Sequence, residues 1–142
     1  MKAKKVVVFA LLAILLLSTF ACGGGGEEEG GVKEVKLGIG LPLSGFVGTV
    51  VGIPAMNAFE LANEKIGEFT VAGQRYRWDL IIEDNLWTGA GGVATATKFI
   101  YEDGVKIMHQ SGADAAGAAQ TICEEAGVLM NMSTAPPALG VG

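Results

Sequence analysis

The sequence has two cysteines, one histidine and few basic residues. A single histidine with no cysteine pair and no clustered carboxylates predicts no metal site. Ten lysines and arginines against fifteen acidic residues give a net charge of -5, without a basic stripe, which argues against nucleic acid as a partner. Cys123 lies in an apolar helical pattern and is expected to be a small buried hydrophobe, although a disulfide to a cysteine beyond Gly142 stays open.

Sequence motifs of catalysis are also missing. Gly89–Gly92 lacks both the dinucleotide-binding spacing and the lysine and hydroxyl pair of a phosphate loop, so it is interpreted as a flexible connection. Ser44 has no nucleophile-elbow motif around it. Glu83 and Asp84 are adjacent on a predicted strand and point to opposite faces. We therefore expect no catalytic residues, no cofactor and no enzymatic activity.

The first 21 residues have the pattern of an export signal. Lysines at positions 2, 4 and 5 precede an apolar run from Val6 to Leu17, and small residues follow it. The apolar run is shorter than the roughly 20 residues that a spanning helix needs. Residues 1–21 are therefore predicted to be a cleaved signal peptide, and their removal takes three lysines away and moves the net charge from -5 to -8.

Cys22 directly follows this segment and resembles the lipidated cysteine of bacterial lipoproteins. Thr19 and Phe20 depart from the usual residues at that cleavage site, so ordinary signal cleavage is the alternative. Gly23–Gly31 contains only glycine and glutamate, which is typical of a flexible, solvated tether. The resemblance implies an extracytoplasmic protein anchored to the membrane surface, in the periplasm or on the outer face, with residues 22–34 as the tether.

From position 35 onward, strand-like and helix-like segments alternate. Such alternation with apolar strands predicts an α/β fold with a parallel sheet covered by helices on both faces. Trp78 falls inside a predicted strand and is expected in the core. The predicted strands are Val35–Leu41, Tyr76–Asp84, Val105–His109 and Val128–Met132, and the predicted helices are Pro54–Ile66, Gly91–Asp103 and Ala113–Glu125.

Five segments of the chain carry a resemblance to a known family: Val35–Gly45, Leu80–Asp84, Asp103–Val105, Glu125–Val128 and Ser133–Pro136. Together they resemble the leucine/isoleucine/valine-binding family of solute receptors, the extracytoplasmic binding proteins of ABC importers. The resemblance implies the type 1 periplasmic-binding fold, in which two lobes enclose a ligand. It also implies that residues 35–142 are a truncated N-terminal lobe, without the hinge and the second lobe.

The candidate site lies at the carboxyl ends of the predicted strands, where open parallel sheets bind ligands. Three segments reach this edge: Leu43–Gly48, Gln110–Asp114 and Ser133–Pro136. The second segment leads into a helix whose first N–H groups favour an anion such as an amino acid's carboxylate. Ser111 is expected to add a hydroxyl group there.

The resemblance implies ligand contacts at specific positions. Ser44 and Phe46 are the candidate ligand contacts in the first loop. Phe46 is the available counterpart of an aromatic residue that covers the ligand, although it comes slightly early in the loop. Asp114 is interpreted as a capping or first-turn residue, or as a group that repels a carboxylate and accepts a cation or amide. The positions that match the family's carboxylate-binding and amine-binding segments are Ser111, Gly112, Ala113, Ser133 and Thr134.

Two further side chains near this edge have open interpretations. His109, the only histidine, either contacts the ligand or serves in packing or a local hydrogen bond. Trp87 either stacks on a ligand or rims the opening, or else anchors its loop.

The predicted function is that of a receptor that binds a small solute and delivers it to an ABC permease. The resemblance favours a branched-chain or related amino acid, with amides, urea and aromatic acids as alternatives. A sensory module of the same fold is the second hypothesis. An envelope enzyme or structural lipoprotein that uses the fold is the third.

Overall fold

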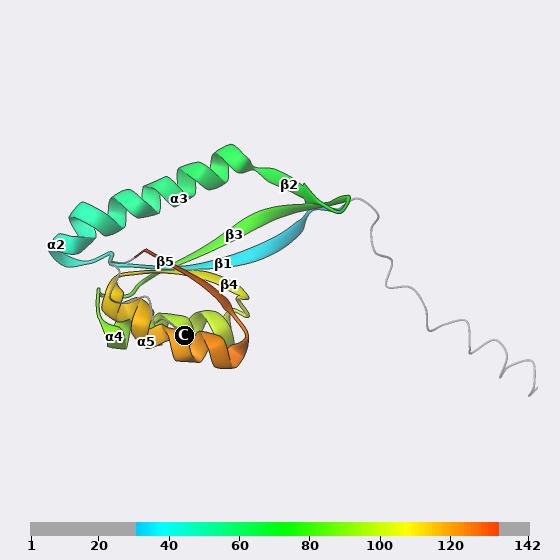
Figure 1. The fold of residues 1–142 in the computed structure, drawn as a ribbon. Helices are drawn as coiled ribbons and strands as arrows, with labels where there is room; N and C mark the ends of the chain where they lie inside the picture. Colours follow the sequence, from blue (N-terminus) through cyan, green and yellow to red (C-terminus); the bar gives the residue numbers. More distant parts are fainter. Residues whose placement is uncertain (1–30, 134–142) are drawn as a thin grey trace, which may run out of the picture. The chain divides into compact units, whose positions relative to one another are not determined.

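The computed structural model describes residues 31–133, which form a mixed α/β fold (Figure 1). Its five-stranded sheet has the order β2-β3-β1-β4-β5. Strands β3, β1, β4 and β5 are parallel to one another, whereas β2 is antiparallel to β3. The strands are β1 (Lys33–Leu41), β2 (Glu68–Val71), β3 (Gln74–Asp84), β4 (Ile107–Ser111) and β5 (Leu129–Ser133).

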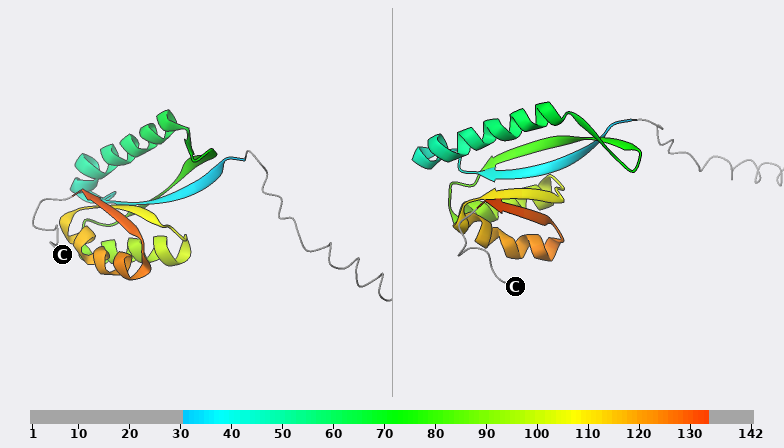
Figure 2. Two further views of the ribbon diagram at one scale, coloured as in Figure 1. Left: turned by 45° about the vertical axis from the view of Figure 1, so that its right-hand side comes forward. Right: turned by 45° about the horizontal axis from the view of Figure 1, so that its top comes forward.

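Helices cover the two faces of the sheet unequally. Helix α3 lies over one face, and helices α4 and α5 lie together against the other (Figures 1 and 2). Two short π-helical segments, η2 and η3, continue into or out of the α-helices. The helical segments are α2 (Gly45–Val47), η2 (Gly48–Gly52), α3 (Ile53–Ile66), α4 (Gly89–Thr97), η3 (Lys98–Glu102) and α5 (Ala113–Ala126).

The main core lies between the sheet and the helix pair α4 and α5. Phe99 is fully buried there and packs over Gly38 of β1, where an added Cβ would come within 2.8 Å of its ring. Met108 of β4 and Cys123 of α5 belong to the same cluster. Glycine at position 38 thus lets a large aromatic ring reach the central strand.

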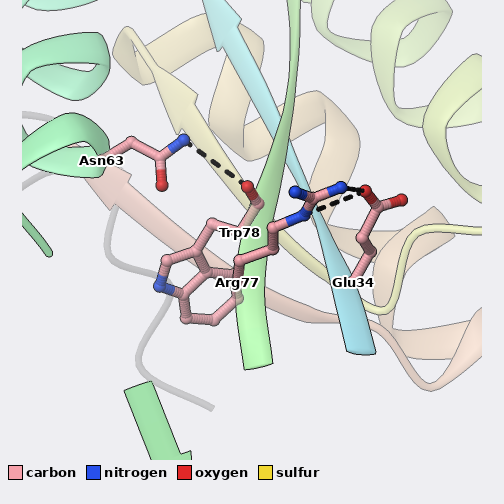
Figure 3. A network of polar contacts seen from close by, with 4 residues as sticks. All are labelled: Glu34, Asn63, Arg77 and Trp78. Atoms are coloured by element: carbon pink, nitrogen blue, oxygen red, sulfur yellow. Dashed lines mark hydrogen bonds and ion pairs between the residues drawn. The ribbon is translucent and has the colours of Figure 1, made fainter. Parts of the chain in front are cut away.

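Helix α3 contacts the opposite face of the sheet loosely, because none of its residues is fully buried. The amide of Asn63 donates a hydrogen bond of 3.4 Å to the carbonyl of Trp78 in β3, close to the Arg77–Glu34 ion pair between β3 and β1 (Figure 3). Phe59 packs on the ring of His109, with 5.3 Å between ring centroids. These contacts make α3 a covering layer of the sheet.

By length and composition alone, the continuous helical stretch Gly45–Ile66 would be able to cross a membrane. The core helix of a soluble protein meets the same two criteria. Asn63 and Phe59 attach this helix to the sheet, and it carries charged residues such as Glu60 and Lys65. We therefore describe it as a layer of the α/β fold.

The expected strand and helix order is confirmed, with corrections at particular places. Strand β2 was not expected; it forms a hairpin with β3 through Ala72 and Gly73, both with positive φ. β1 begins at Lys33, so the last two residues of the expected tether at 22–34 belong to the sheet. Trp78 was expected in the core but is only partly buried, and its ring stacks on Phe69 of the unexpected edge strand β2.

The expected flexible connection at Gly89–Gly92 is also corrected, because it forms the first turn of α4. Thr88 caps this helix by accepting a hydrogen bond from the N–H of Gly91 at 3.0 Å. A Cβ at Gly92 would lie 2.2 Å from the carbonyl oxygen of Ala115 in α5. The glycines therefore allow close packing of α4 on α5, which a flexible loop would not provide.

Candidate functional site

The carboxyl ends of β1, β3 and β4 are joined by one buried side chain, Asn85. Its backbone N–H donates to the carbonyl of Leu41 at 2.8 Å. Its side-chain amide donates to the carbonyls of Gly40 and Ser111, at 3.2 and 2.7 Å. Because buried polar groups are stable only when they are paired, these bonds fix the three strand ends relative to one another.

Gln110 extends this network beneath α4. Its side-chain oxygen accepts from Asn85 at 3.1 Å, and its nitrogen donates to the hydroxyl of Thr95 at 2.7 Å. Gln110 lies against Gly40, where an added Cβ would be 2.2 Å from the glutamine oxygen. The edge of the sheet is thus supported by a connected set of hydrogen bonds, and it offers a rigid base for a site.

Asp84 joins the end of β1 to the loop after β3. One carboxylate oxygen accepts from the N–H groups of Leu43 and Leu86, at 2.9 and 2.8 Å. Burial acts to raise the pKa of Asp84, but these two bonds and one from the Ser44 side chain together hold that pKa below its ordinary value. The group is therefore an anion at neutral pH and serves to position both loops.

The end of β4 and the start of α5 form the centre of the candidate site. Gly112, with φ of 98°, is the N-cap of α5 and has no side chain to cap the helix, while its N–H donates to the carbonyl of Ser133 at 3.1 Å. The hydroxyls of Ser111 and Ser133 lie 3.2 Å apart. Two hydroxyl groups and the amino end of a 14-residue helix therefore converge at one edge of the sheet.

His109 lies two residues before Ser111 on β4 and adds a third polar side chain beside the two serines. Its Nε2 atom lies 3.3 Å from the hydroxyl of Ser133, and its ring is tilted against Phe59. Burial lowers the pKa of His109, and a hydrogen bond with the Asn131 side chain acts in the opposite direction. A local hydrogen bond and ring packing are the roles that the structure shows for this side chain.

Trp87 packs against the start of α5 from a tight turn. Leu86 and Trp87 both have positive φ, and the N–H of Thr88 donates to the carbonyl of Asn85 at 3.1 Å. The Asn85 side chain accepts from the N–H of Trp87 at 3.0 Å and holds this conformation, which costs of order 1–3 kcal/mol for each residue outside glycine. The indole, 41% exposed, lies against Gly112, where a Cβ would be 3.0 Å from the ring.

The predicted site residues fall into three groups. Ser111, Gly112 and Ser133 are brought together, and Ala113 and Asp114 are exposed in the first turn of α5. Ser44 is the exposed N-cap of α2, and Phe46 is 80% exposed within α2. Thr134 and Cys22 lie outside the described residues.

Two of the expected loops are shorter than the sequence suggested. Ser111 is the last residue of β4, and the chain turns into α5 at Gly112. The segment after Leu43 becomes helical at Gly45, because the glycines at 48 and 52 pack against the backbone of Pro42 and Leu43. Only Pro42–Ser44 therefore remains as a connection at the end of β1.

Solved structures of solute-binding proteins are similar to this chain. LivK, a leucine-binding protein from Thermotoga maritima, matches with a TM-score of 0.64 and 24% identity over 76% of this chain and 30% of that protein. A solute-binding protein of an ABC transporter from Rhodopseudomonas palustris, in complex with 3,4-dihydroxybenzoic acid, has a TM-score of 0.62 and 25% identity over 71% of this chain and 27% of that one.

LivJ from Streptococcus pneumoniae, in complex with isoleucine, has a TM-score of 0.61 and 21% identity over 72% of this chain and 29% of that protein. The three matched proteins are solute-binding proteins rather than enzymes, and the fold of this chain is the type 1 periplasmic-binding fold. This chain spans less than a third of the length of each of them. No protein-family model and no curated protein sequence matches it.

Proposed function

We propose that this chain contributes one wall of an extracytoplasmic receptor that binds a small solute and delivers it to an ABC permease. The observation that carries the proposal is the meeting of Ser111, Gly112 and Ser133 at the amino end of α5. Small hydroxyl groups and the N–H groups of the first turn of a helix suit a carboxylate or an amide. A solute-binding protein of an ABC transporter with the same fold supports the transport role.

The proposed ligand is a branched-chain or related amino acid. A carboxylate at the start of α5 gains from the helix dipole, which is worth about 0.3–1 kcal/mol at exposed sites. The names of two matched proteins include leucine or isoleucine, and a third binds an aromatic acid. Amides and urea are the alternative ligands, and Asp114 in the first turn of α5 favours them by repelling a carboxylate.

The second candidate function is ligand sensing by the same fold. It would use the same edge of the sheet, but closure on the ligand would signal to another protein. The Gly/Glu tether after Cys22 favours delivery, since a lipid-anchored receptor can diffuse along the membrane to a permease. Loss of solute uptake, without loss of a transcriptional response, on deletion of the gene would support delivery over sensing.

The test of this proposal is a solute panel measured by calorimetry on the mature exported protein. Ser111→Ala and Thr134→Ala should each weaken binding by about 0.5–1.5 kcal/mol if the lost hydrogen bond is to a neutral group of the ligand. The loss should be about 1.5–3 kcal/mol if that group is charged. The matched control is Thr97→Ala on the exposed side of α4, which should leave affinity unchanged. Unchanged affinity in both site variants would place the pocket elsewhere.

Asp114→Asn separates the two ligand classes. If the ligand presents a carboxylate to α5, removing the charge of Asp114 should strengthen binding. If the ligand presents an amine or amide, the same substitution should weaken it. Equal affinity for the parent and the variant would mean that Asp114 does not interact with the ligand.

A further inference from the structure

Three sulfur atoms from three different elements meet in the core, away from the candidate ligand edge. The thiol of Cys123 in α5 lies 3.5 Å from the sulfur of Met108 in β4 and 3.8 Å from the sulfur of Met130 in β5. Met108 and Met130 are direct partners in the parallel pairing of β4 and β5. Their side chains therefore share one face of the sheet beneath α5.

We propose that Cys123, Met108 and Met130 form a binding site for a Cu(I) ion. Thiolate and thioether ligands select soft cations such as Cu(I), whereas carboxylates and carbonyls suit hard ones. The donor set at this place therefore favours a soft monovalent ion.

The two separations from the Cys123 sulfur fit a three-coordinate ion with small adjustments. Three sulfurs at about 2.3 Å from a central ion would be about 4 Å from one another. The observed separations of 3.5 and 3.8 Å are shorter by a few tenths of an ångström. Methionine has three rotatable bonds and adapts readily to such shifts.

Charge balance also favours Cu(I) at this depth. Cys123 is 2% exposed and Met108 is fully buried, so an unpaired charge here would be costly. On binding, the Cu–S bond to Cys123 forms, the S–H bond breaks and the proton leaves to solvent. Copper stays in the +1 state, and the thiolate–Cu(I) pair is neutral.

Two of the three proposed ligands reach a cavity, which Met108 does not line. Cys123 and Met130 line a cavity of about 160 Å³ beside α5. The carboxylate-bearing side chain of Glu124 lines the same cavity and attracts cations to it. The full lining is Gln120, Cys123, Glu124, Val128, Met130 and Met132.

The test is anaerobic titration of the full 142-residue chain with Cu(I) in competition with a chromophoric Cu(I) chelator. Cys22→Ser is present in every sample, so that Cys123 is the only thiol. We expect one Cu(I) per chain, complete loss of this binding in Cys123→Ala, and at least tenfold weaker binding in Met130→Leu. Met56→Leu, a change in α3, is the matched control and should bind as the parent does.

Circular dichroism shows whether each variant keeps its fold. If Met130→Leu binds Cu(I) as tightly as the parent, the sulfurs only pack together and the proposal is wrong. If a variant fails to fold, X-ray absorption on the Cu(I)-loaded parent measures the number of sulfur atoms bound to copper. Three sulfur neighbours are expected, and fewer than three would also overturn the site.

Discussion

Asp84 connects two loops of the candidate site through a single carboxylate oxygen. The N–H groups of Leu43 and Leu86 both depend on it as an acceptor. Hydrogen bonds to a charged group contribute about 1.5–3 kcal/mol each. Asp84 is thus a structural support of this edge of the sheet.

Replacing Asp84 by alanine removes both bonds and should lower the free energy of unfolding at pH 7 by at least the value of one of them, about 1.5–3 kcal/mol. The pKa of Asp84 is lower in the folded protein than its ordinary value, so its contribution is present above about pH 3.9 and is lost as pH falls through the folded pKa. Urea unfolding at pH 7 and pH 3 measures this. Asp79→Ala is the control, and an Asp84 effect that does not shrink at low pH would contradict the hydrogen-bonding role.

His109 should titrate below its ordinary pKa of about 6.5, because its ring is partly buried. Folding is then most favoured above that pH, and this contribution is lost as pH falls through the folded pKa. The protein has one histidine, so its imidazole signals in NMR are unambiguous. Asn131→Ala should lower the midpoint further, and the exposed Asn57→Ala should not; a midpoint above 6.5 would contradict this account.

Among single residues, the sequence predicted which positions of the candidate site lie together, but it did not predict the hydrogen bonds of Asn85 that support them. Ser111, Gly112 and Ser133 were predicted to meet because neighbouring parallel strands end at the same edge of a sheet. The role of Asn85 was not predictable, since its amide bonds reach Gly40 and Ser111, 45 and 26 positions away. Such pairings depend on the order of the strands in the sheet, which cannot be read from the local sequence pattern.

Between elements, the contact of α4 with α5 depends on glycine. Gly92 lies against the backbone of α5, where a Cβ would be 2.2 Å from the carbonyl oxygen of Ala115. Gly117 lies within α5, with no atom within 4 Å of an added Cβ. Substitution by alanine therefore adds a methyl group in a crowded environment at Gly92 and in open space at Gly117.

Gly92→Ala should destabilise the protein by at least about 1–3 kcal/mol, because overpacking forces backbone shifts. Gly117→Ala should stabilise it by roughly 0.5–1 kcal/mol, since alanine is the better helix former. Thermal unfolding of both variants measures the difference. Equal effects at the two positions would mean that α4 and α5 do not pack as closely as described.

Element type and order were more predictable than element boundaries. Apolar runs identified β1 and β3 to β5, because buried parallel strands are apolar along their length. The β2–β3 hairpin was missed because Ala72 and Gly73 do not make the usual asparagine–glycine turn, and Ala72 takes a positive φ of 50°. The glycines of α4 looked like a loop by propensity, and packing on α5 overrides that preference.

For the whole molecule, the proposed attachment to the membrane depends on Cys22. We expect the exported protein to partition into detergent and to carry the mass of a lipid-modified cysteine. Cys22→Ser should release it or leave it uncleaved, because acyl chains contribute about 0.8 kcal/mol per buried methylene. Unchanged partitioning and unchanged mature mass would contradict lipid anchoring.

One wall of a cleft leaves a bound solute open to water on its other side. Ligand pockets gain affinity by burying most of the ligand surface. Residues 23–142 alone should therefore bind no solute more tightly than about 1 mM, equivalent to about -4 kcal/mol. Micromolar affinity would mean that these residues already form a complete site.

The most direct measurement of the central claim is NMR chemical-shift mapping of ¹⁵N-labelled residues 23–142 with L-leucine and 3,4-dihydroxybenzoate at tens of millimolar. We predict that at least one of the two solutes shifts the amides of Ser111–Ala115 and Ser133 most, because the hydroxyls and the amino end of α5 meet there. Ser111→Ala should reduce those shifts, and the exposed Thr97→Ala should not. Shifts centred on other residues, or none at this edge with either solute, would contradict the assignment of the solute site.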